Sequence, residues 1–256
     1  MKITKEKYPI LEFDQETKAV INPNLLTETH PSLKGDCLVI SFFHEVTRKL
    51  IREKKIVKHL VIKGENNLVL YKFLDADIYL MNGIVGGPAS GGYLDELTGL
   101  GIKRVMFIGG GGVLDKNIKT GALMIVKGAI RDEGFSYHYL KPERIVYSDT
   151  RITEIIANYL KKRGIPFFEG ITWTTDAFYR ETRDLIQMRK EEGASMVEME
   201  QASLLAVSKF RNLQYVAIIY SGDDISDILY DQRNWRDKKD IRRTLVEMAK
   251  ELVVLF

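Results

Sequence analysis

Apolar and polar positions along the chain follow two periods, one typical of buried strands and one typical of amphipathic helices. Short apolar runs predict strands at 37–43, 76–81, 104–108, 122–130, 167–175, 195–199 and 215–220, with a hairpin over 59–74. Apolar residues on one helical face predict helices over 44–57, 87–100, 150–163 and 201–210. The chain ends in a predicted amphipathic helix that presents Ile241, Leu245, Met248, Leu252 and Leu255 on one face.

This alternation favours an α/β fold with a single three-layer domain, in which helices flank a mixed central sheet. No composition shift and no Pro-, Gly- or Ser-rich linker divides residues 1–256, so we expect one domain with 1–34 as an N-terminal extension packing on it. Such sheets bind ligands at the carboxyl ends of their strands. Candidate chemistry is therefore sought directly after each predicted strand.

Composition excludes several classes of protein. Apolar residues make up 45% and charged residues 29% of the 256, and the net charge is +3, which gives no argument for a nucleic-acid partner. The single cysteine, Cys37, excludes an internal disulfide and a Cys-x-x-Cys metal site, and it suits a reducing compartment. No signal peptide is recognisable and no apolar run reaches the roughly 18–20 residues of a membrane helix, so we expect a cytoplasmic protein without a membrane partner.

A run of four glycines, Gly109, Gly110, Gly111 and Gly112, follows the predicted strand 104–108. Their backbone N–H groups could converge on an anion, although the run lacks the Lys-Ser/Thr of a P-loop and the spacing of a dinucleotide fingerprint. A tight turn where two backbones pass closely is the alternative, and spacing alone does not separate the two.

Carboxylates follow two other predicted strands. Glu198 and Glu200 lie two residues apart on a strand end and point the same way, so they could grip vicinal hydroxyls. A solvated acidic strand end leading into a helix is the alternative that spacing alone favours. Asp223 and Asp224 follow the last strand, where an Asp serves as a general acid or, more commonly, as a turn or helix cap.

The sequence leaves the role of one charged, aromatic segment open, and it shows no metal-binding pattern among the histidines. The segment 131–139 mixes opposite charges with aromatic residues, which fits a salt-bridged structural loop, part of a pocket or a subunit contact. The four histidines pair with no carboxylate or cysteine at a metal-ligand spacing. We therefore predict no protein-bound metal.

Taken in order, these motifs resemble the nucleoside phosphorylase family, which includes uridine phosphorylase and bacterial-type purine nucleoside phosphorylase. Each motif alone is weak, but six of them in the family's order and spacing are specific, and the resemblance covers roughly residues 35 to 255. The segments that carry it are 83–88, 109–112, 129–134 with 137–139, 176–179, 198–200 and 223–224.

The resemblance implies a role for each motif. Met199 is expected to pack on the ribose and Glu200 to accept hydrogen bonds from its 2′- and 3′-hydroxyls, with Glu198 in the same motif. Phe178 is expected to border the base, together with Tyr179. These five residues form the expected sugar and base site.

Five more positions complete the site that the resemblance implies. Asp223 matches the acid that protonates a purine as it leaves in purine-type members. Gly83 is expected to line the sugar-phosphate cleft, and Gly109, Gly110 and Gly111 are the expected contacts for phosphate.

The chain also departs from the family pattern. The family's early phosphate loop, Gly-Asp-Pro-x-Arg, aligns with 42–46, which read Phe-Phe-His-Glu-Val. The strand that ends Arg-Ile-Gly-Thr in the family reads Phe-Ile-Gly-Gly at 107–110, so both phosphate-binding arginines are absent. The Gln and Arg that hold uracil are replaced by Thr182 and Asp184.

These features predict a nucleoside phosphorylase-like enzyme, a pentosyltransferase that cleaves the N-glycosidic bond of a small-molecule nucleoside. Inorganic phosphate is the expected co-substrate, with no other cofactor, and a purine is slightly favoured over uridine. A phosphate-independent nucleosidase and a non-catalytic nucleoside-binding member are the alternatives. The resemblance also implies a homo-oligomer, whether dimer, trimer or hexamer.

Overall fold

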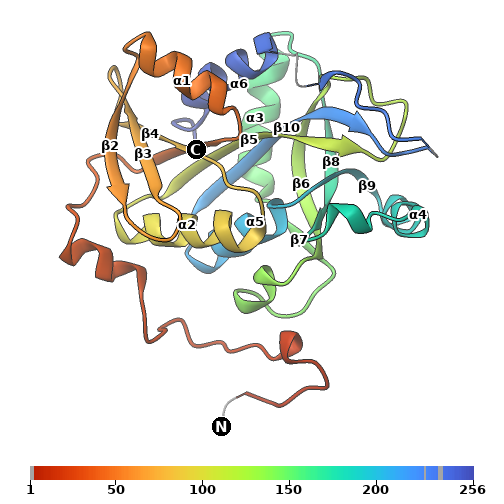
Figure 1. The fold of residues 1–256 in the computed structure, drawn as a ribbon, viewed down its shortest axis with the longest axis horizontal. Helices are drawn as coiled ribbons and strands as arrows, with labels where there is room; N and C mark the ends of the chain where they lie inside the picture. The colour runs from red at the N-terminus through yellow and green to blue at the C-terminus, as the bar shows by residue number, and fades with distance from the viewer. Residues whose placement is uncertain (1–2, 228, 236–238) are drawn as a thin grey trace.

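One ten-stranded mixed sheet organises the computed structural model, which describes residues 3–227, 229–235 and 239–256 (Figure 1). Its strand order is β10-β6-β8-β9-β5-β1-β4-β3-β2, with β7 paired to β6. The strands are β1 Cys37–Ser41, β2 Ile56–Ile62, β3 Leu68–Phe73, β4 Ile78–Asn82, β5 Arg104–Val113, β6 Leu123–Asp132, β7 Ile145–Tyr147, β8 Phe167–Thr175, β9 Ala194–Glu198 and β10 Gln214–Asp224.

Strand β5 joins two parts of this sheet. It pairs in parallel with β1 on one side and β10 on the other, and its last residues pair antiparallel with β9. Since β10 also pairs with β6, β6 with β8, and β8 with β9, five strands close into a ring. The remaining strands, β1, β4, β3 and β2, extend from this ring as an open sheet.

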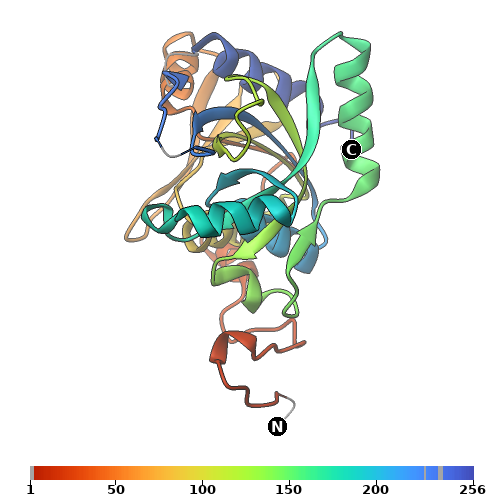
Figure 2. The ribbon, with the colours of Figure 1, turned by 90° about the vertical axis from the view of Figure 1, so that its right-hand side faces the viewer.

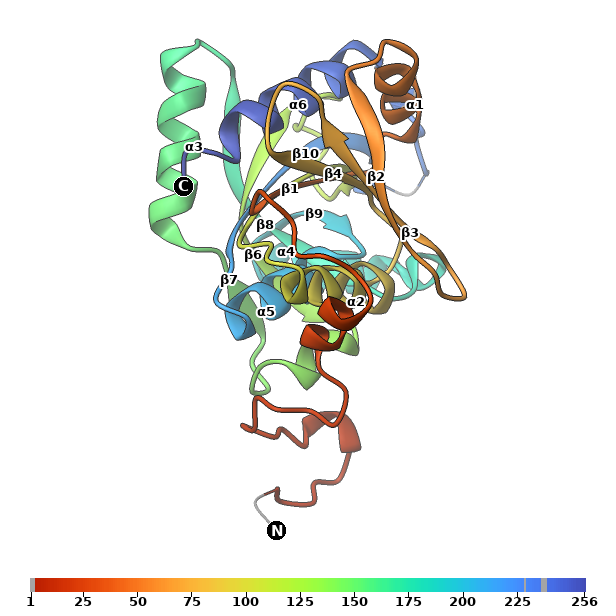
Figure 3. The ribbon, with the colours of Figure 1, turned by 90° about the vertical axis from the view of Figure 1, so that its left-hand side faces the viewer.

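Helices cover both faces, so the predicted three-layer α/β fold is confirmed (Figures 1 and 3). Apolar residues of α1, α3 and α6 share one buried cluster with the sheet, and those of α2 and α5 share the other. The helices are α1 His44–Arg52, α2 Gly87–Gly99, α3 Thr150–Lys162, α4 Arg183–Glu191, α5 Gln201–Phe210 and α6 Lys239–Leu252. None of the described helices is long and apolar enough to cross a membrane.

Local signals explain several helix ends. Asp149 caps α3 because its side chain accepts a hydrogen bond from the backbone N–H of Arg151 at 2.8 Å, and Gly164 follows the helix with φ of +65°. The prediction that the first helix reaches residue 57 was wrong. Helix α1 ends at Arg52, because Lys54 takes a left-handed φ of +55° and β2 begins at Ile56.

The glycine run belongs to a strand rather than to a turn or a loop. Strand β5 continues through it, with Gly109, Gly110 and Gly111 opposite Ile219, Tyr220 and Ser221 of β10. A Cβ on Gly111 would lie 2.7 Å from the carbonyl oxygen of Val197, so close backbone approach requires glycine there. Helix α4 and strand β7 are further elements that the hydrophobic pattern did not predict.

Residues 3–34 form an arm with little regular structure, which runs across α2 and away from the sheet (Figures 1 and 2). Its 3₁₀ turn Pro23–Glu28 packs on α2, and Leu26 and Leu33 join the core on that face. Val20 and Ile21 on the same arm are exposed. Apolar contacts therefore fasten the second half of the arm to the sheet domain, and the first half contacts it where the 3₁₀ turn Pro9–Leu11 meets the 3₁₀ turn Phe135–His138.

Candidate active site

A cleft of about 880 Å³ lies at the carboxyl ends of β8, β9 and β10, the position expected for a ligand site in such a sheet. Aromatic, acidic and small apolar side chains form its wall, and most come from the segments that directly follow these strands. The lining residues are Gly112, Phe178, Tyr179, Glu181, Thr182, Arg183, Ile186, Val197, Glu198, Met199, Asp223, Ile225, Asp227, Tyr230 and Trp235.

Five of the predicted site residues meet in this cleft. They come from three separate motifs and are Phe178, Tyr179, Glu198, Met199 and Asp223. The other predicted positions do not line it. Glu200 is buried beside it, and Gly83, Gly109, Gly110 and Gly111 lie behind its wall or under neighbouring rings.

An aromatic pair stands at the cleft entrance. Phe178 and Tyr179 belong to the 3₁₀ turn Phe178–Arg180 after β8, and their ring centroids are 4.1 Å apart. The two side chains are 51% and 89% exposed. Exposed rings in a cleft offer a flat surface on which a planar heterocycle can stack.

Glu198 serves as a buried cap for α5. One of its oxygens accepts a hydrogen bond from the hydroxyl of Thr174 at 2.5 Å, and the other accepts from the backbone N–H groups of Glu200 at 2.6 Å and Gln201 at 2.7 Å. Burial raises the pKa of Glu198 to about 6, and the three hydrogen-bond donors, with the positive end of α5, offset part of this effect by stabilising the carboxylate. Glu198 therefore lies at an acidic strand end that leads into a helix, but it is buried and not solvated as that alternative expected.

Glu200 points elsewhere and has a different charge state. Its Oε1 accepts a hydrogen bond from the backbone N–H of Gly86, at the start of α2, at 2.9 Å. Burial and the nearby charge of Glu198 raise the pKa of Glu200. Of the two carboxyl groups, Glu198 holds the negative charge and Glu200 retains a proton more easily.

Acidic groups dominate the described part of the cleft wall. The carboxyl groups of Glu181, Glu198, Asp223 and Asp227 line it, and the guanidinium of Arg183 is the one basic side chain among the described lining residues. Burial, helped by the charge of Asp223, raises the pKa of Glu181 to about 7. Glu181 was not predicted as a site residue, although it is the second residue after the Asp-x-Phe-Tyr motif that ends at Tyr179.

The neighbouring part of the sheet edge, where the resemblance puts phosphate, is packed with rings. A Cβ on Gly83 would lie 2.0 Å from the ring of Phe42, and one on Gly109 would lie 2.8 Å from that of Phe107. The rings of Phe42 and Phe107 contact each other at 5.4 Å between centroids. Trp235 lies over Gly110, where a Cβ would come within 3.2 Å of it.

A guanidinium does lie near these rings, but it has a carboxylate partner. Arg242 of α6 donates to Glu45 at 2.7 Å and to the hydroxyl of Tyr220 at 2.9 Å. The ring of Trp235 lies 5.2 Å from the same guanidinium. The charge of Arg242 is thus balanced by Glu45 within the protein.

The loop 131–139 is held by hydrogen bonds, as expected of a structural loop, and its residues Phe135, His138 and Tyr139 also line a cleft, as another alternative expected. Arg131 is buried and donates to the hydroxyl of Ser136 at 2.8 Å and to the carbonyl oxygen of Lys141 at 2.6 Å. Glu133 accepts from the backbone N–H of Ser136 and the hydroxyl of Ser203, both at 2.9 Å. These bonds fix the loop to α5.

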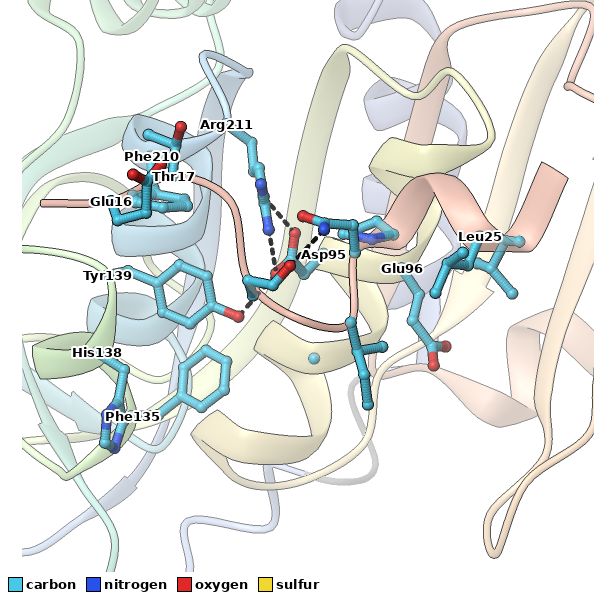
Figure 4. A pocket seen from close by; sticks show the side chains of 16 residues that line it. Glu16, Thr17, Leu25, Asp95, Glu96, Phe135, His138, Tyr139, Phe210 and Arg211 are labelled. Atoms are coloured by element: carbon cyan, nitrogen blue, oxygen red, sulfur yellow. Dashed lines mark hydrogen bonds and ion pairs between the residues drawn. The ribbon is translucent and has the colours of Figure 1, made fainter. Parts of the chain in front are cut away.

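A second cleft, of about 580 Å³, separates the N-terminal arm from α2 and α5 (Figure 4). Arg211 forms a fork on Asp95 at 2.6 and 3.1 Å, and the hydroxyl of Tyr139 donates to Asp95 at 2.8 Å. Figure 4 shows these three side chains directed toward one another. Their polar groups satisfy each other, so this network ties α2 to α5 and to the 131–139 loop.

Neither cysteine nor histidine adds a metal or a nucleophile to the described site. Burial raises the pKa of Cys37 to about 11, and its side chain lies in the core. In the described ranges, no three His, Cys, Asp or Glu side chains gather as a metal ion would require.

Comparison with known proteins agrees with this architecture. The uridine phosphorylase of Thermococcus kodakarensis is 27% identical over 143 residues, which span 51% of this chain and about half, 52%, of that relative. The crystal structure of uridine phosphorylase from Vibrio fischeri ES114 has a TM-score of 0.73 at 18% identity, over 89% of this chain and 99% of that one. AMP nucleosidase from Bacteroides thetaiotaomicron has a TM-score of 0.69 at 18% identity, over 90% and 96%. A family model described as the phosphorylase superfamily matches residues 43–256, so the chain belongs to that superfamily.

Proposed function

We propose that this protein cleaves the N-glycosidic bond of a nucleoside in the cleft at the ends of β8, β9 and β10. The observation that carries this proposal is the meeting of three family motifs in one cleft, with Phe178, Met199 and Asp223 on its wall. Met199 and Glu200 are assigned to the ribose, and Phe178 and Tyr179 to the base. Superfamily membership supports this class of reaction.

Water is the acceptor that the charge of the cleft favours over phosphate. Four carboxyl groups face it against the single guanidinium of Arg183 in the described lining. A phosphate dianion needs charge-assisted partners to offset the loss of its hydration, and carboxylates repel it. The same balance disfavours a nucleotide that carries a 5′-phosphate. Phosphorolysis, supported by the similarity to uridine phosphorylase, is the second candidate.

The chemistry expected of the cleft follows from the transition state. When the bond between C1′ and the base nitrogen breaks, positive charge develops on the sugar ring and negative charge on the base. Carboxylates fixed around the sugar stabilise the first charge without having to reorient. A carboxylic acid near the base neutralises the second by giving up a proton.

A purine is the base that the lining favours. A leaving purine gains from protonation of its five-membered ring, and Asp223 stands where the family's purine-type acid is expected. Thr182 and Asp184 replace the Gln and Arg that hold uracil in the family. We therefore assign a purine nucleoside as the preferred substrate class.

The proposal is tested by incubating the purified protein with adenosine, inosine and uridine, each with and without inorganic phosphate, and measuring the released base. We expect release of a purine base and free ribose without phosphate. Release that occurs only with phosphate, together with ribose 1-phosphate, would establish phosphorolysis instead. Binding of a nucleoside without release in either condition would contradict catalysis.

A further inference from the structure

Resting on the proposed function, we propose that Glu181 donates the proton to the leaving base, that ionised Asp223 acts beside it, and that the two together select a 6-aminopurine. The proposal assigns a catalytic residue that the family motifs do not include. Glu181 and Asp223 come from different strand ends, β8 and β10, and line the same cleft.

The backbone holds Glu181 at the base side of the cleft. Its N–H donates to the carbonyl oxygen of Phe178 at 3.2 Å, which closes the 3₁₀ turn that carries the aromatic pair. Helix α4 begins two residues later, at Arg183. The carboxyl group therefore has a rigid backbone on both sides and lies next to the rings assigned to the base.

The carboxyl group of Glu181 makes no hydrogen bond or ion pair with any described residue, and among the partly buried acids a buried oxygen of Glu96, outside this cleft, is likewise without a partner. Asp224 pairs with Arg233, Glu45 with Arg242, and Asp132 with both Arg189 and Trp173. A desolvated acid without a protein partner is costly as a carboxylate, and a ligand atom can use its proton.

The surroundings of Glu181 favour its protonated form near neutral pH. The charged and titratable groups that face the cleft with it are Tyr179, Arg183, Glu198, Asp223, Asp227 and Tyr230. Burial has the largest effect and the charge of Asp223 adds to it, which raises the pKa to about 7. An acid whose pKa lies near the working pH is suited to general acid catalysis.

The proposed step is balanced with water as the co-reactant. The bond between C1′ and N9 breaks, and its electron pair goes to the purine, while the proton of Glu181 goes to N7. Water adds its oxygen to C1′ and releases a proton, and this proton restores Glu181 for the next turnover. The products are the neutral base and the free pentose.

The pair also explains a preference among purines. Adenine presents an acceptor at N7 and a donor at the 6-amino group, whereas guanine, like hypoxanthine, presents acceptors at both N7 and O6. A protonated Glu181 beside an ionised Asp223 offers one donor and one acceptor, which matches the edge of adenine. An oxygen at position 6 would face the carboxylate of Asp223 and be repelled.

The test compares pH profiles of kcat/KM for adenosine in the wild type, Glu181→Gln, Asp223→Asn and the control Glu191→Gln, which makes the same change on the exposed side of α4. The wild type should lose activity as pH rises through about 7. Glu181→Gln should lower kcat/KM by about 10²–10⁴-fold, and its pH profile should no longer fall above pH 7. Asp223→Asn should move the wild-type fall to lower pH, because the charge that holds the proton is gone, and Glu191→Gln should match the wild type.

The assignment would be overturned if Glu181→Gln kept wild-type activity or kept the fall of kcat/KM above pH 7. It would also be overturned if this fall occurred at the same pH in Asp223→Asn as in the wild type. Adenosine should also be cleaved faster than inosine, and the reverse order would contradict the selection of a 6-amino group. Because Glu181 has no described protein partner, its variant should keep the wild-type melting temperature.

A binding measurement separates failure of this inference from failure of the proposed function. Trp235 lines the cleft, so its fluorescence should report the binding of free adenine. If the wild type binds adenine more weakly above pH 7 and Glu181→Gln abolishes this pH dependence, the contact between Glu181 and the base stands. If, in addition, no nucleoside is cleaved, the proposed function fails while the contact still stands. If Glu181→Gln cleaves nucleosides as the wild type does, the proposed function stands and Glu181 is not the proton donor.

Discussion

Two neighbouring parts of the same sheet edge differ in what lies over them: one is filled by aromatic rings and the other opens into a cleft. Beyond β1, β4 and β5, the rings of Phe42 and Phe107 lie on Gly83 and Gly109, and Arg242 is paired with Glu45. We name this the filled half. Beyond β8, β9 and β10, the edge opens into a cleft with carboxyl groups on its wall, and we name this the open half. Trp235 separates them, since it lines the cleft and also lies over Gly110.

The difference between the halves is one of desolvation. A ring that packs on a glycine buries apolar area and excludes water, so an anion placed there would lose its hydration, and the guanidinium of Arg242 is already paired with Glu45. In the open half, the acidic residues line a cleft and can act on a neutral or positively charged reactant that enters it. The comparison assigns the sugar and base to the open half and gives the filled half a packing role.

The largest expected effect comes from removing both acids of the open half. The double variant Glu181→Gln/Asp223→Asn should reduce purine nucleoside cleavage by about 10²–10⁴-fold, because general acid catalysis contributes that much. Base release measured at saturating nucleoside checks this. Asp224→Asn should do far less to turnover, since Asp224 pairs with Arg233 and does not line the cleft. An equal loss in Asp224→Asn would show that both changes act through the fold.

Glu200 lies between the two halves and tests the ribose assignment. Glu200→Gln should weaken nucleoside binding by about 1.5–3 kcal/mol, typical of hydrogen bonds to a charged group. The sugar hydroxyls donate to Glu200 and favour its ionised form, so the loss should be largest near pH 8.5. Calorimetry with adenosine measures it, and free adenine, which lacks the ribose, should bind both proteins equally. Unchanged adenosine affinity would remove Glu200 from the site.

In the filled half, a substitution is expected to lower the stability of the fold and not the rate of catalysis. Gly83→Ala should lower the free energy of unfolding by about 1–3 kcal/mol, because the new Cβ meets the ring of Phe42. The matched control is Gly92→Ala inside α2, where a Cβ meets nothing within 4 Å and a gain of about 0.5–1 kcal/mol is expected. Urea denaturation compares the three proteins. Equal stability of the two variants would show that Phe42 moves aside freely.

A gradual effect, spread over several pH units, is a pH dependence of stability that arises from Glu200. Its pKa is raised in the folded protein above the ordinary 4.5, so the folded state binds the proton more tightly than the unfolded state. Wild-type stability should therefore fall as pH rises above about 4.5, by at most about 1.4 kcal/mol per pH unit for one proton. Melting temperatures from pH 4 to 8 should drop less in Glu200→Gln. Parallel curves for the two proteins would contradict a raised pKa.

Much of the fold could be predicted from the sequence, and less of the site. The apolar runs located every strand of the sheet except β7, and the helical faces located α2, α3, α5 and α6, because each pattern is set by neighbours along the chain. The end of α1 and the whole of α4 were not predicted, since Arg183–Glu191 has only Ile186 and Arg189 buried and therefore shows little apolar periodicity.

The site shows the same division between local and distant causes. The motifs containing Phe178, Met199 and Asp223 were found because each directly follows a strand. Glu181 was missed because its special character depends on burial and on Asp223, which lies 42 residues further along the chain and across the cleft. Sequence spacing carries no signal of that proximity.

The sequence by itself determined the alternation of strands and helices, the three-layer class and the motifs at the strand ends, because these depend on periodicity and on residue type. Only the tertiary structure decided that the glycine run is a strand under Trp235, that Glu198 caps α5 while Glu200 reaches Gly86, and that Arg242 is balanced by Glu45. Hydrogen bonding and desolvation depend on which distant groups are brought within a few ångströms, and that proximity is set by the packing of the whole chain.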